Sequence, residues 1–471
     1  MNPLVLSDAD CKAVFERITQ LALEYVASVS DQPSFPKITG SEIEALFAKP
    51  LPEQGMRSQA LDDLDLVIEF VRVTSPRFFG YVLGSGEPVG AAADLLASVL
   101  NQNVTAWRSS PSAVTIERVV VGWLAEAIRC TGFTGSLTGG GSSANLMGLA
   151  MAREARVPAN ESGARPGTIY ASEQVHMSIP KAIALLGIGR ENLRLIPCDD
   201  NFRIRVDLLR ASMERDVRAG LTPIAIVGSA GTVSTGSIDP LVELAAIARE
   251  SGAWFHVDGA YGALAAIAEP AKFAGLNQAD SLSLDPHKWL YQPLDCGCLL
   301  YRDPGAARRA FSHTGDYAKS LVDDPVEGFA FFEESIELSR RFRALKIWLS
   351  LRYHGLANFR QAIRNDLTHA QLLAGLVAKQ PELELLAPVP LSAVCFRYRS
   401  RGDADSDSDA LNQKILQRVV RRGKVFLSNA TIHGSFALRA CIVNHRTTPD
   451  DIEQVVSEVL AVGRELSAGV S

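Results

Sequence analysis

Short apolar runs alternate with helical segments between residues 86 and 355, and this alternation constrains the fold more than any other feature of the chain. The β-rich runs are 168–171, 224–227, 254–257 and 298–301. Segments with helical spacing separate several of them, for example 241–250. Runs that are apolar on both faces are typical of a central sheet covered by helices on each side. The pattern therefore predicts an α/β layer architecture.

Different patterns flank this region. Residues 1–85 are predicted to form helices interrupted by prolines, and such a segment should pack on the rest of the chain or on a second subunit. Helices are also expected over 340–351 and 359–378. Because 471 residues exceed the usual limit for one core, we expect an N-terminal helical segment (1–85), a large domain (86–360) and a small C-terminal α/β domain (361–471).

Composition excludes several classes of function. A formal net charge of −6 implies no basic face, which argues against nucleic acid as a partner. No apolar run reaches the length of a membrane span, and residues 1–8 lack the basic region and apolar core of a signal peptide. The seven cysteines show no CxxC pair or zinc spacing, and Cys296 and Cys298 are expected to be small buried strand residues rather than metal ligands. These features predict a cytoplasmic, reduced protein with no metal and no membrane contact.

A glycine-rich stretch precedes a helical pattern. Gly139, Gly140 and Gly141 are followed by Ser142 and Ser143, and apolar residues then recur at helical spacing. The N–H groups and the dipole at a helix N-terminus bind anions, so this loop could hold a phosphate. A flexible glycine–serine loop without a ligand explains the same residues equally well. The stretch is neither GxGxxG nor a Walker A loop, which disfavours a nucleotide.

Three further positions follow or end apolar strands. Asp258 ends the run 254–257, at the edge where open α/β sheets bind ligands, and the small Ala260 leaves space beside it for a flat ring. Lys288 lies between apolar flanks, where desolvation makes a lysine amine a usable nucleophile. His176 follows the run 168–171 and could stack on a ring or donate to a substrate. The alternatives are that Asp258 only caps the following helix and that His176 is an ordinary loop residue.

The order of these features along the chain is that of a pyridoxal 5′-phosphate (PLP) site: phosphate loop, histidine, aspartate, lysine. The chain resembles the group II PLP-dependent decarboxylases, whose members act on aromatic amino acids, glutamate and cysteine sulfinate. The most specific motifs are 256–261 and 285–289 (Asp-Pro-His-Lys-Trp), and the resemblance extends over 75–81, 101–107 and 339–346.

This resemblance implies the fold-type I, aspartate-aminotransferase-like architecture: a large, mixed, mostly parallel sheet domain and a small C-terminal α/β domain. It also implies a homodimer with the active site at the interface. By motif match, Lys288 would hold PLP as a Schiff base, Asp258 would pair with the ring nitrogen and His176 would stack on the ring. The remaining cofactor-binding positions would be Ala260, Gly141, Ser142, Thr232 and His287.

The implied activity is decarboxylation of an L-amino acid to carbon dioxide and an amine. A gapless count back from Arg340 places the tyrosine that many family members use as proton donor on Phe331, although Tyr317 could serve instead. In some plant relatives a phenylalanine at this point accompanies oxidative deamination to an aldehyde, which is the alternative activity. A catalytically silent protein that keeps the PLP fold is a further alternative.

The substrate pocket departs from the best-known branches of the family. Val82 and Leu83 follow Tyr81 where animal aromatic enzymes have bulkier residues, and Trp107 is a possible aromatic wall or a core residue. Ser339 lies where plant enzymes have glycine or serine, and serine accompanies phenolic substrates. The resemblance therefore favours an aromatic amino acid as substrate.

Overall fold

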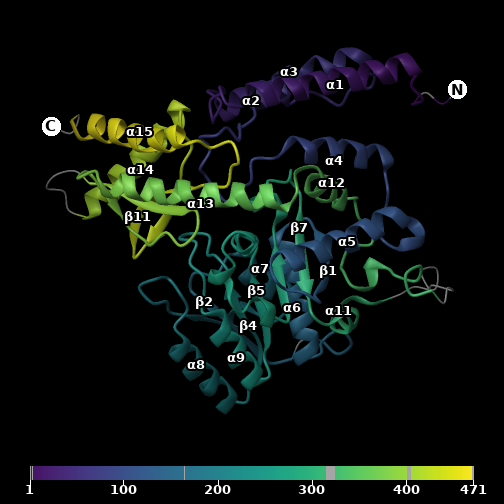
Figure 1. Cartoon of the computed structure of the whole chain (residues 1–471), viewed down its shortest axis with the longest axis vertical. Coiled ribbons are helices and arrows are strands. Elements are labelled where there is room, and N and C mark those ends of the chain that lie inside the picture. The colour runs from purple at the N-terminus through teal and green to yellow at the C-terminus, as the bar shows by residue number, and fades with distance from the viewer. Residues whose placement is uncertain (1, 3, 164, 314–323, 400–404, 469–471) are drawn as a thin grey trace.

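The protein is described by a computed structural model that covers residues 2, 4–163, 165–313, 324–399 and 405–468 (Figure 1). An N-terminal arm of helices lies along one side of the molecule: α1 (Asp8–Ser28), α2 (Gly40–Phe47), the 3₁₀ helix Arg57–Leu61 and α3 (Asp63–Glu69). Side-chain caps set its helix starts. Ser7 accepts a hydrogen bond from the Asp10 N–H, and Thr39 and Glu42 form a capping box at α2.

A seven-stranded sheet forms the centre of the molecule. In chain order the strands are β1 (Thr134–Thr138), β2 (Gly167–Ser172), β3 (Leu193–Ile196), β4 (Thr222–Ser229), β5 (Trp254–Asp258), β6 (Ser281–Leu284) and β7 (Gly297–Tyr301). Their order in the sheet is β1-β7-β6-β5-β4-β2-β3. Only β7 runs antiparallel to its neighbours, so the carboxyl ends of the other six strands meet at one edge.

Helices cover both faces of this sheet (Figure 1). They are α4 (Pro88–Leu100), α5 (Pro111–Ala127), α6 (Gly141–Arg156), α7 (Ser178–Leu185), α8 (Val206–Arg218), α9 (Leu241–Ser251), the short α10 (Pro286–Trp289), α11 (Pro304–Phe311) and α12 (Ala344–His354). Prolines at the first position start α4, α5, α10 and α11, where the missing N–H has no helical partner to lose.

The long helix α13 (Leu356–Ala378) leads to a second, four-stranded antiparallel sheet in the order β10-β11-β9-β8. Its elements are β8 (Leu383–Leu385), β9 (Ala393–Tyr398), α14 (Asp405–Arg422), β10 (Ser428–Ile432), β11 (Ser435–Cys441) and α15 (Pro449–Ala468). The proposed domain boundary at 360/361 lies inside α13, so one continuous helix joins the two sheets. No helix in the described ranges is long and apolar enough to cross a membrane.

The helix expected over 340–351 begins later than its apolar spacing suggests. It starts at Ala344, because Arg340 serves a different purpose: its guanidinium is buried, pairs with Glu117 and donates to the carbonyl groups of Val104 and Leu137. Both side chains of the Arg340–Glu117 pair are 1% exposed. A buried charge needs such partners, and this pair joins α5 and β1 to the segment before α12.

Candidate active site

The predicted cofactor-binding residues meet in one cavity of about 330 Å³ at the carboxyl edge of the main sheet. The glycine loop follows β1, His176 follows β2, Asp258 ends β5 and Lys288 follows β6. The cavity is lined by Gly139, Gly140, Gly141, Ser142, Ser143, Asn145, His176, Ser229, Gly231, Thr232, Val233, Asp258, Ala260, Tyr261, Asp285, His287, Lys288 and Leu294. Parallel strands thus bring distant segments together at one edge.

The glycine loop ends in an open helix N-terminus. The N–H groups of Ser143 and Ala144 donate to the Gly140 carbonyl, which leaves those of Gly141 and Ser142, among the described residues, free for an anion. Glycine is required at 141, because a Cβ there would lie 2.6 Å from the Ala260 Cβ and 3.0 Å from Asp285 Oδ2. This close approach places the helix start directly beside the rest of the site.

Lys288 is held by a carboxylate three residues earlier in the chain. Its Nζ lies 2.8 Å from Asp285 Oδ2, and His287 Nε2 lies 3.5 Å from the same oxygen. The other oxygen, Asp285 Oδ1, is buried and has no hydrogen-bond partner within the described structure. Burial lowers the pKa of His287, against the opposing effect of Asp285. The cavity therefore contains an amine with a carboxylate placed to exchange a proton with it.

Asp258 and His176 have defined but different settings. Asp258 Oδ1 accepts hydrogen bonds from Ser283 Oγ and from the Ala260 N–H, both at 3.2 Å. His176 Nδ1 lies 2.8 Å from Ser178 Oγ and accepts from the Ser178 N–H at 3.2 Å. Burial lowers the pKa of His176, so its imidazole is neutral at pH 7. A fixed carboxylate and a neutral imidazole thus line the same cavity.

Thr232 also lines the cavity. Its Oγ1 accepts from the Ser237 N–H at 3.1 Å and lies 3.0 Å from the hydroxyl oxygen of Thr235. The hydroxyl of Thr235 therefore lies beside that of Thr232, whereas Val233, the next residue in the chain, has no hydroxyl.

Two polar cavity residues that the sequence interpretation did not assign lie on α6 and just before α10. Asn145 lies one helical turn beyond Gly141, a spacing that puts both on the same side of α6. Asp285 precedes Lys288 by three residues, so the short helix α10 brings the two side chains together. Both spacings are visible in the sequence.

Several expected site residues lie outside this cavity. Phe331 is fully buried (0% exposed), with its ring edge-on to Phe329 and beneath the Arg340 guanidinium. Tyr81 is half exposed and packs near Phe78, Trp107 is partly buried against the main core, and Ser339 lines a separate cavity of about 450 Å³. Tyr317 lies outside the described residues.

Val82 and Leu83 precede Gly84, whose backbone packs against the His287–Lys288 backbone. The Gly84 N–H donates to the His287 carbonyl at 3.0 Å. A Cβ at Gly84 would lie 2.5 Å from the carbonyl oxygens of both His287 and Lys288. This segment therefore supports the Lys288 backbone, although Val82 and Leu83 do not line the cavity.

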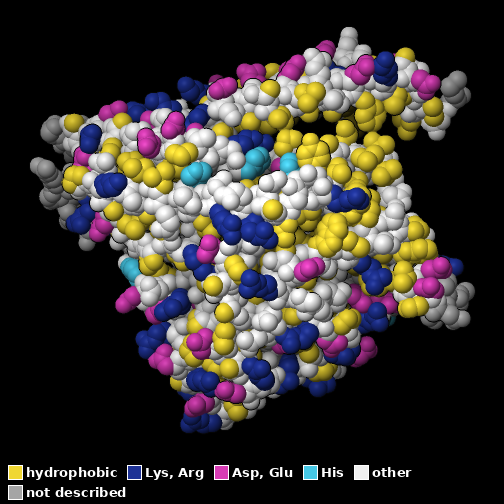
Figure 2. Space-filling model, viewed as in Figure 1, with side chains coloured by type: hydrophobic (Ala, Val, Ile, Leu, Met, Phe, Trp, Pro, Cys, Tyr) yellow, Lys and Arg dark blue, Asp and Glu magenta, His cyan; other side chains and the backbone are white. Residues whose placement is uncertain are grey.

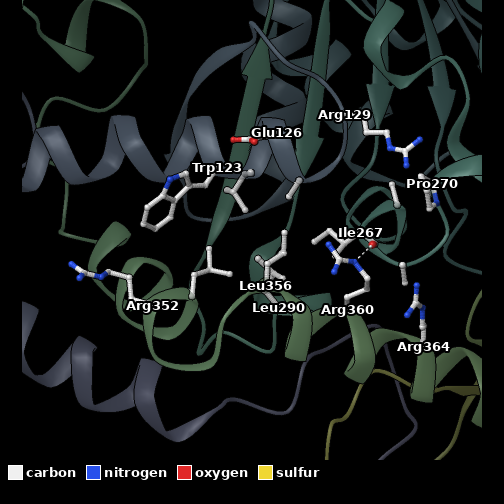
Figure 3. A pocket seen from close by; sticks show the side chains of 15 residues that line it. Trp123, Glu126, Arg129, Ile267, Pro270, Leu290, Arg352, Leu356, Arg360 and Arg364 are labelled. Atoms are coloured by element: carbon white, nitrogen blue, oxygen red, sulfur yellow. Dashed lines mark hydrogen bonds between the residues drawn. The ribbon is translucent and has the colours of Figure 1, made fainter.

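A larger cavity, of about 890 Å³, lies elsewhere, between the end of α5 and the junction of α12 and α13 (Figure 3). Figure 3 shows Arg129, Arg352, Arg360 and Arg364 around its rim and Trp123 on one wall. It includes none of the four motif positions and no lysine. The predicted cofactor-binding residues therefore line the smaller cavity and not the larger one.

The donor set of the smaller cavity fits PLP. An aldehyde needs an amine, which Lys288 supplies, and a phosphate needs N–H donors, which the α6 N-terminus supplies. A pyridine nitrogen needs an acid to stay protonated, and Asp258 is the carboxylate that ends β5. The missing side chain at Gly141 and the small one at Ala260 leave the space that a flat ring requires.

Comparison with known proteins agrees with this fit. A model of the pyridoxal-dependent decarboxylase conserved domain matches residues 43–399. The chain belongs to this family. It is 33% identical to an aromatic-L-amino-acid decarboxylase of Bacillus atrophaeus, covering 98% of each chain. It is 32% identical to a phenylacetaldehyde synthase of Petunia hybrida, covering 78% of this chain and 76% of the relative.

A crystal structure of Oryza sativa TDC with PLP and tryptamine superimposes on the decarboxylase with a TM-score of 0.92, at 26% identity and covering 99% of each chain. The expected fold class, a mixed main sheet with a smaller C-terminal unit, is confirmed. The protein is a PLP-dependent carboxy-lyase of the group II decarboxylases, and the reaction it serves is amino-acid decarboxylation.

Proposed function

We propose that this decarboxylase converts an aromatic L-amino acid into carbon dioxide and the corresponding amine. The observation that carries the proposal is the convergence of Lys288, Asp258, His176 and the α6 N-terminus on one cavity. The aromatic preference is supported by the full-length similarity to the Bacillus aromatic-L-amino-acid decarboxylase.

Each residue has a distinct task in this reaction. PLP, when bound, accepts the electron pair left on the substrate when carbon dioxide departs. Lys288 supplies the amine that carries the cofactor, and Asp285, 2.8 Å from Nζ, is placed to take or return its proton. Asp258 would keep the ring of the bound cofactor protonated, and the N–H groups of Gly141 and Ser142 would bind its phosphate and so fix the orientation of the ring.

Proton delivery decides between an amine and an aldehyde. The buried packing of Phe331 supports assigning the proton donor to Tyr317 rather than treating the tyrosine as absent. Oxidative deamination to an aldehyde is the second candidate, favoured by the 32% identity to the Petunia phenylacetaldehyde synthase. The Tyr317 assignment predicts that Tyr317→Phe moves product from amine toward aldehyde, ammonia and peroxide.

The deciding experiment is a panel of L-amino acids in which carbon dioxide, amine, aldehyde, ammonia and peroxide are all measured. Aromatic substrates should give amine and carbon dioxide in equal amounts. Preferential turnover of glutamate or cysteine sulfinate would refute the aromatic assignment. Aldehyde and peroxide from the unaltered enzyme would establish the second candidate instead.

We also propose that the protein acts as a homodimer. The apolar groups in the cavity are few, namely Val233, Ala260, Tyr261 and Leu294, so an aromatic side chain needs a further wall that a second copy can supply. Figure 2 shows hydrophobic side chains on the underside of the N-terminal arm and on the surface that faces it. On α4 the exposed ones are Leu95, Leu96, Val99 and Leu100. Covering such a patch is the usual reason for association.

The proposed location is the cytoplasm. All seven cysteines, Cys11, Cys130, Cys198, Cys296, Cys298, Cys395 and Cys441, are unpaired. Free thiols of this kind are typical of a reducing compartment.

A further inference from the structure

A continuous chain of hydrogen bonds leads from the sheet interior to the active-site histidine. It starts on β5 and β6, crosses to α6 and ends at the start of α7. In order, its members are Trp254, Ser281, His256, Asn145, Ser178 and His176. The five links measure 2.8, 2.7, 2.9, 2.9 and 2.8 Å. The four links up to Ser178 lie among buried side chains, where a hydrogen bond is strong and an unmade one is costly.

The first part of the chain has a defined proton order. The indole N–H of Trp254 can only donate, so Ser281 Oγ accepts from it. Within the described hydrogen bonds, the Ser281 hydroxyl proton has one acceptor, His256 Nδ1. His256 therefore carries its proton on Nε2 and donates to Asn145 Oδ1. Burial lowers the pKa of His256 to about 4, so its imidazole is neutral and the assignment holds at pH 7.

The second part follows from the first. With its oxygen used by His256, Asn145 donates through Nδ2 to Ser178 Oγ. The Ser178 hydroxyl then donates to His176 Nδ1. The backbone N–H of Ser178, which can only donate, lies 3.2 Å from the same nitrogen. Both ends of the chain thus require His176 Nδ1 to be an acceptor.

We propose that this chain fixes His176 as the neutral tautomer with its proton on Nε2, and that Asn145 is a positioning residue for the active site. Nε2 has no hydrogen bond to a described residue, so its N–H is available to a group bound in the cavity. Asn145 acts through Ser178 and His176. Its amide can donate on one side and accept on the other, and this combination transmits the proton order across α6.

The close packing of α6 on β5 supports a built arrangement. A Cβ at Gly148, three residues after Asn145, would lie 2.6 Å from Cε1 of His256. A side chain there would displace the imidazole from Asn145. Glycine at 148 therefore permits the contact between α6 and the imidazole that the chain needs.

The direct test is the tautomer of His176 in the holoenzyme. Protein labelled with ¹⁵N-histidine would be studied by solid-state NMR at pH 7, and the His176 signals assigned by their loss in His176→Gln. The proposal requires a protonated Nε2 and an unprotonated Nδ1. An Nδ1-protonated or doubly protonated His176 in the unaltered enzyme would overturn it, and this measurement needs no variant that perturbs the chain.

Asn145→Asp tests the positioning role without changing shape. A carboxylate can accept from His256 but cannot donate to Ser178, so the Ser178 hydroxyl turns toward residue 145 and no longer donates to His176. The Ser178 N–H, at 3.2 Å, is then the remaining donor to Nδ1, so an Nδ1-protonated form of His176 should appear beside the Nε2-protonated form. The matched control is Asn365→Asp, the same change at an exposed position of α13 whose Oδ1 only accepts, from Gln361. This control should leave the His176 spectrum unchanged.

The effect on turnover is a second readout. Loss of one properly oriented hydrogen bond to a bound group should lower kcat/KM by about 10- to 100-fold in Asn145→Asp. An unchanged His176 tautomer in a folded Asn145→Asp protein would refute the positioning role. The proposal rests on the cofactor site of the proposed function but not on the substrate. The amino-acid panel therefore tests one independently of the other.

Discussion

Gly141→Ala tests whether the start of α6 is the phosphate site. The added Cβ would lie 2.6 Å from the Ala260 Cβ and 3.0 Å from Asp285 Oδ2. Neither neighbour is the free end of a flexible side chain, because Ala260 is fixed by its backbone and Asp285 holds Lys288. The loop must therefore move away from the cavity, and the N–H groups of residues 141 and 142 move with it.

The expected cost follows from the hydrogen bonds that the move breaks. A hydrogen bond between a charged phosphate and an N–H contributes about 1.5–3 kcal/mol. Losing one such bond raises the dissociation constant for PLP about 10- to 100-fold. The assay is a titration of the apoenzyme with PLP, followed by absorbance and by quenching of tryptophan fluorescence.

Two further variants make the result specific. Gly375→Ala, in the last turn of α13, places a Cβ in open space and should leave PLP affinity unchanged while stabilising the helix by up to about 1 kcal/mol. Gly141→Ala combined with Ala260→Gly removes the shorter of the two contacts and should recover most of the affinity. If Gly141→Ala bound PLP as tightly as the unaltered chain, the phosphate would have to be held elsewhere.

Three other changes have defined outcomes. Lys288→Ala should abolish the borohydride-reducible cofactor adduct and the yellow absorbance, and persistence of the same adduct would refute the assignment of the lysine. His256→Gln should reduce acid sensitivity: below pH 6.5 the unfolded chain protonates this histidine, whereas the folded chain does so only near pH 4. The unaltered protein should therefore lose about 2 kcal/mol more stability than the variant between pH 7 and 5, measured by urea unfolding. Val99→Glu on α4 (Val99 is 56% exposed) should dissociate the dimer in sedimentation experiments, whereas Val217→Glu on α8 (54% exposed) should not; equal effects would refute the proposed interface.

The proposed cofactor residues could be identified in the sequence because each follows or ends a strand. Apolar runs mark the strands, and the polar residue that follows each run falls at the same edge of a parallel sheet. This pattern predicts His176, Asp258 and Lys288 as site residues, and all three line the cavity. The predictable part of the site is therefore the part set by periodicity and strand order.

Other features depend on contacts that no local pattern specifies. The apolar spacing predicts that Arg340 lies in the first turn of a helix, but its buried pairing with Glu117 keeps it outside α12. Phe331 was placed by counting along the chain, and its burial against Phe329 depends on tertiary packing. The substrate-pocket residues could not be placed from periodicity, because a pocket wall supplied by a second subunit, as proposed above, would follow no repeat in one chain.

The contact of Gly84 with the Lys288 backbone gives the cofactor site a mechanical link to the proposed interface. α4 begins four residues after Gly84 and carries its exposed apolar residues, Val99 among them, in its second half. The N–H of Glu87, just before α4, donates to the Tyr291 carbonyl at 2.8 Å. Both ends of this short segment are thus anchored next to the lysine. By thermodynamic reciprocity, any strengthening of the dimer by PLP must equal the strengthening of PLP binding by dimer formation. Dilution of the enzyme would then release cofactor as well as subunits.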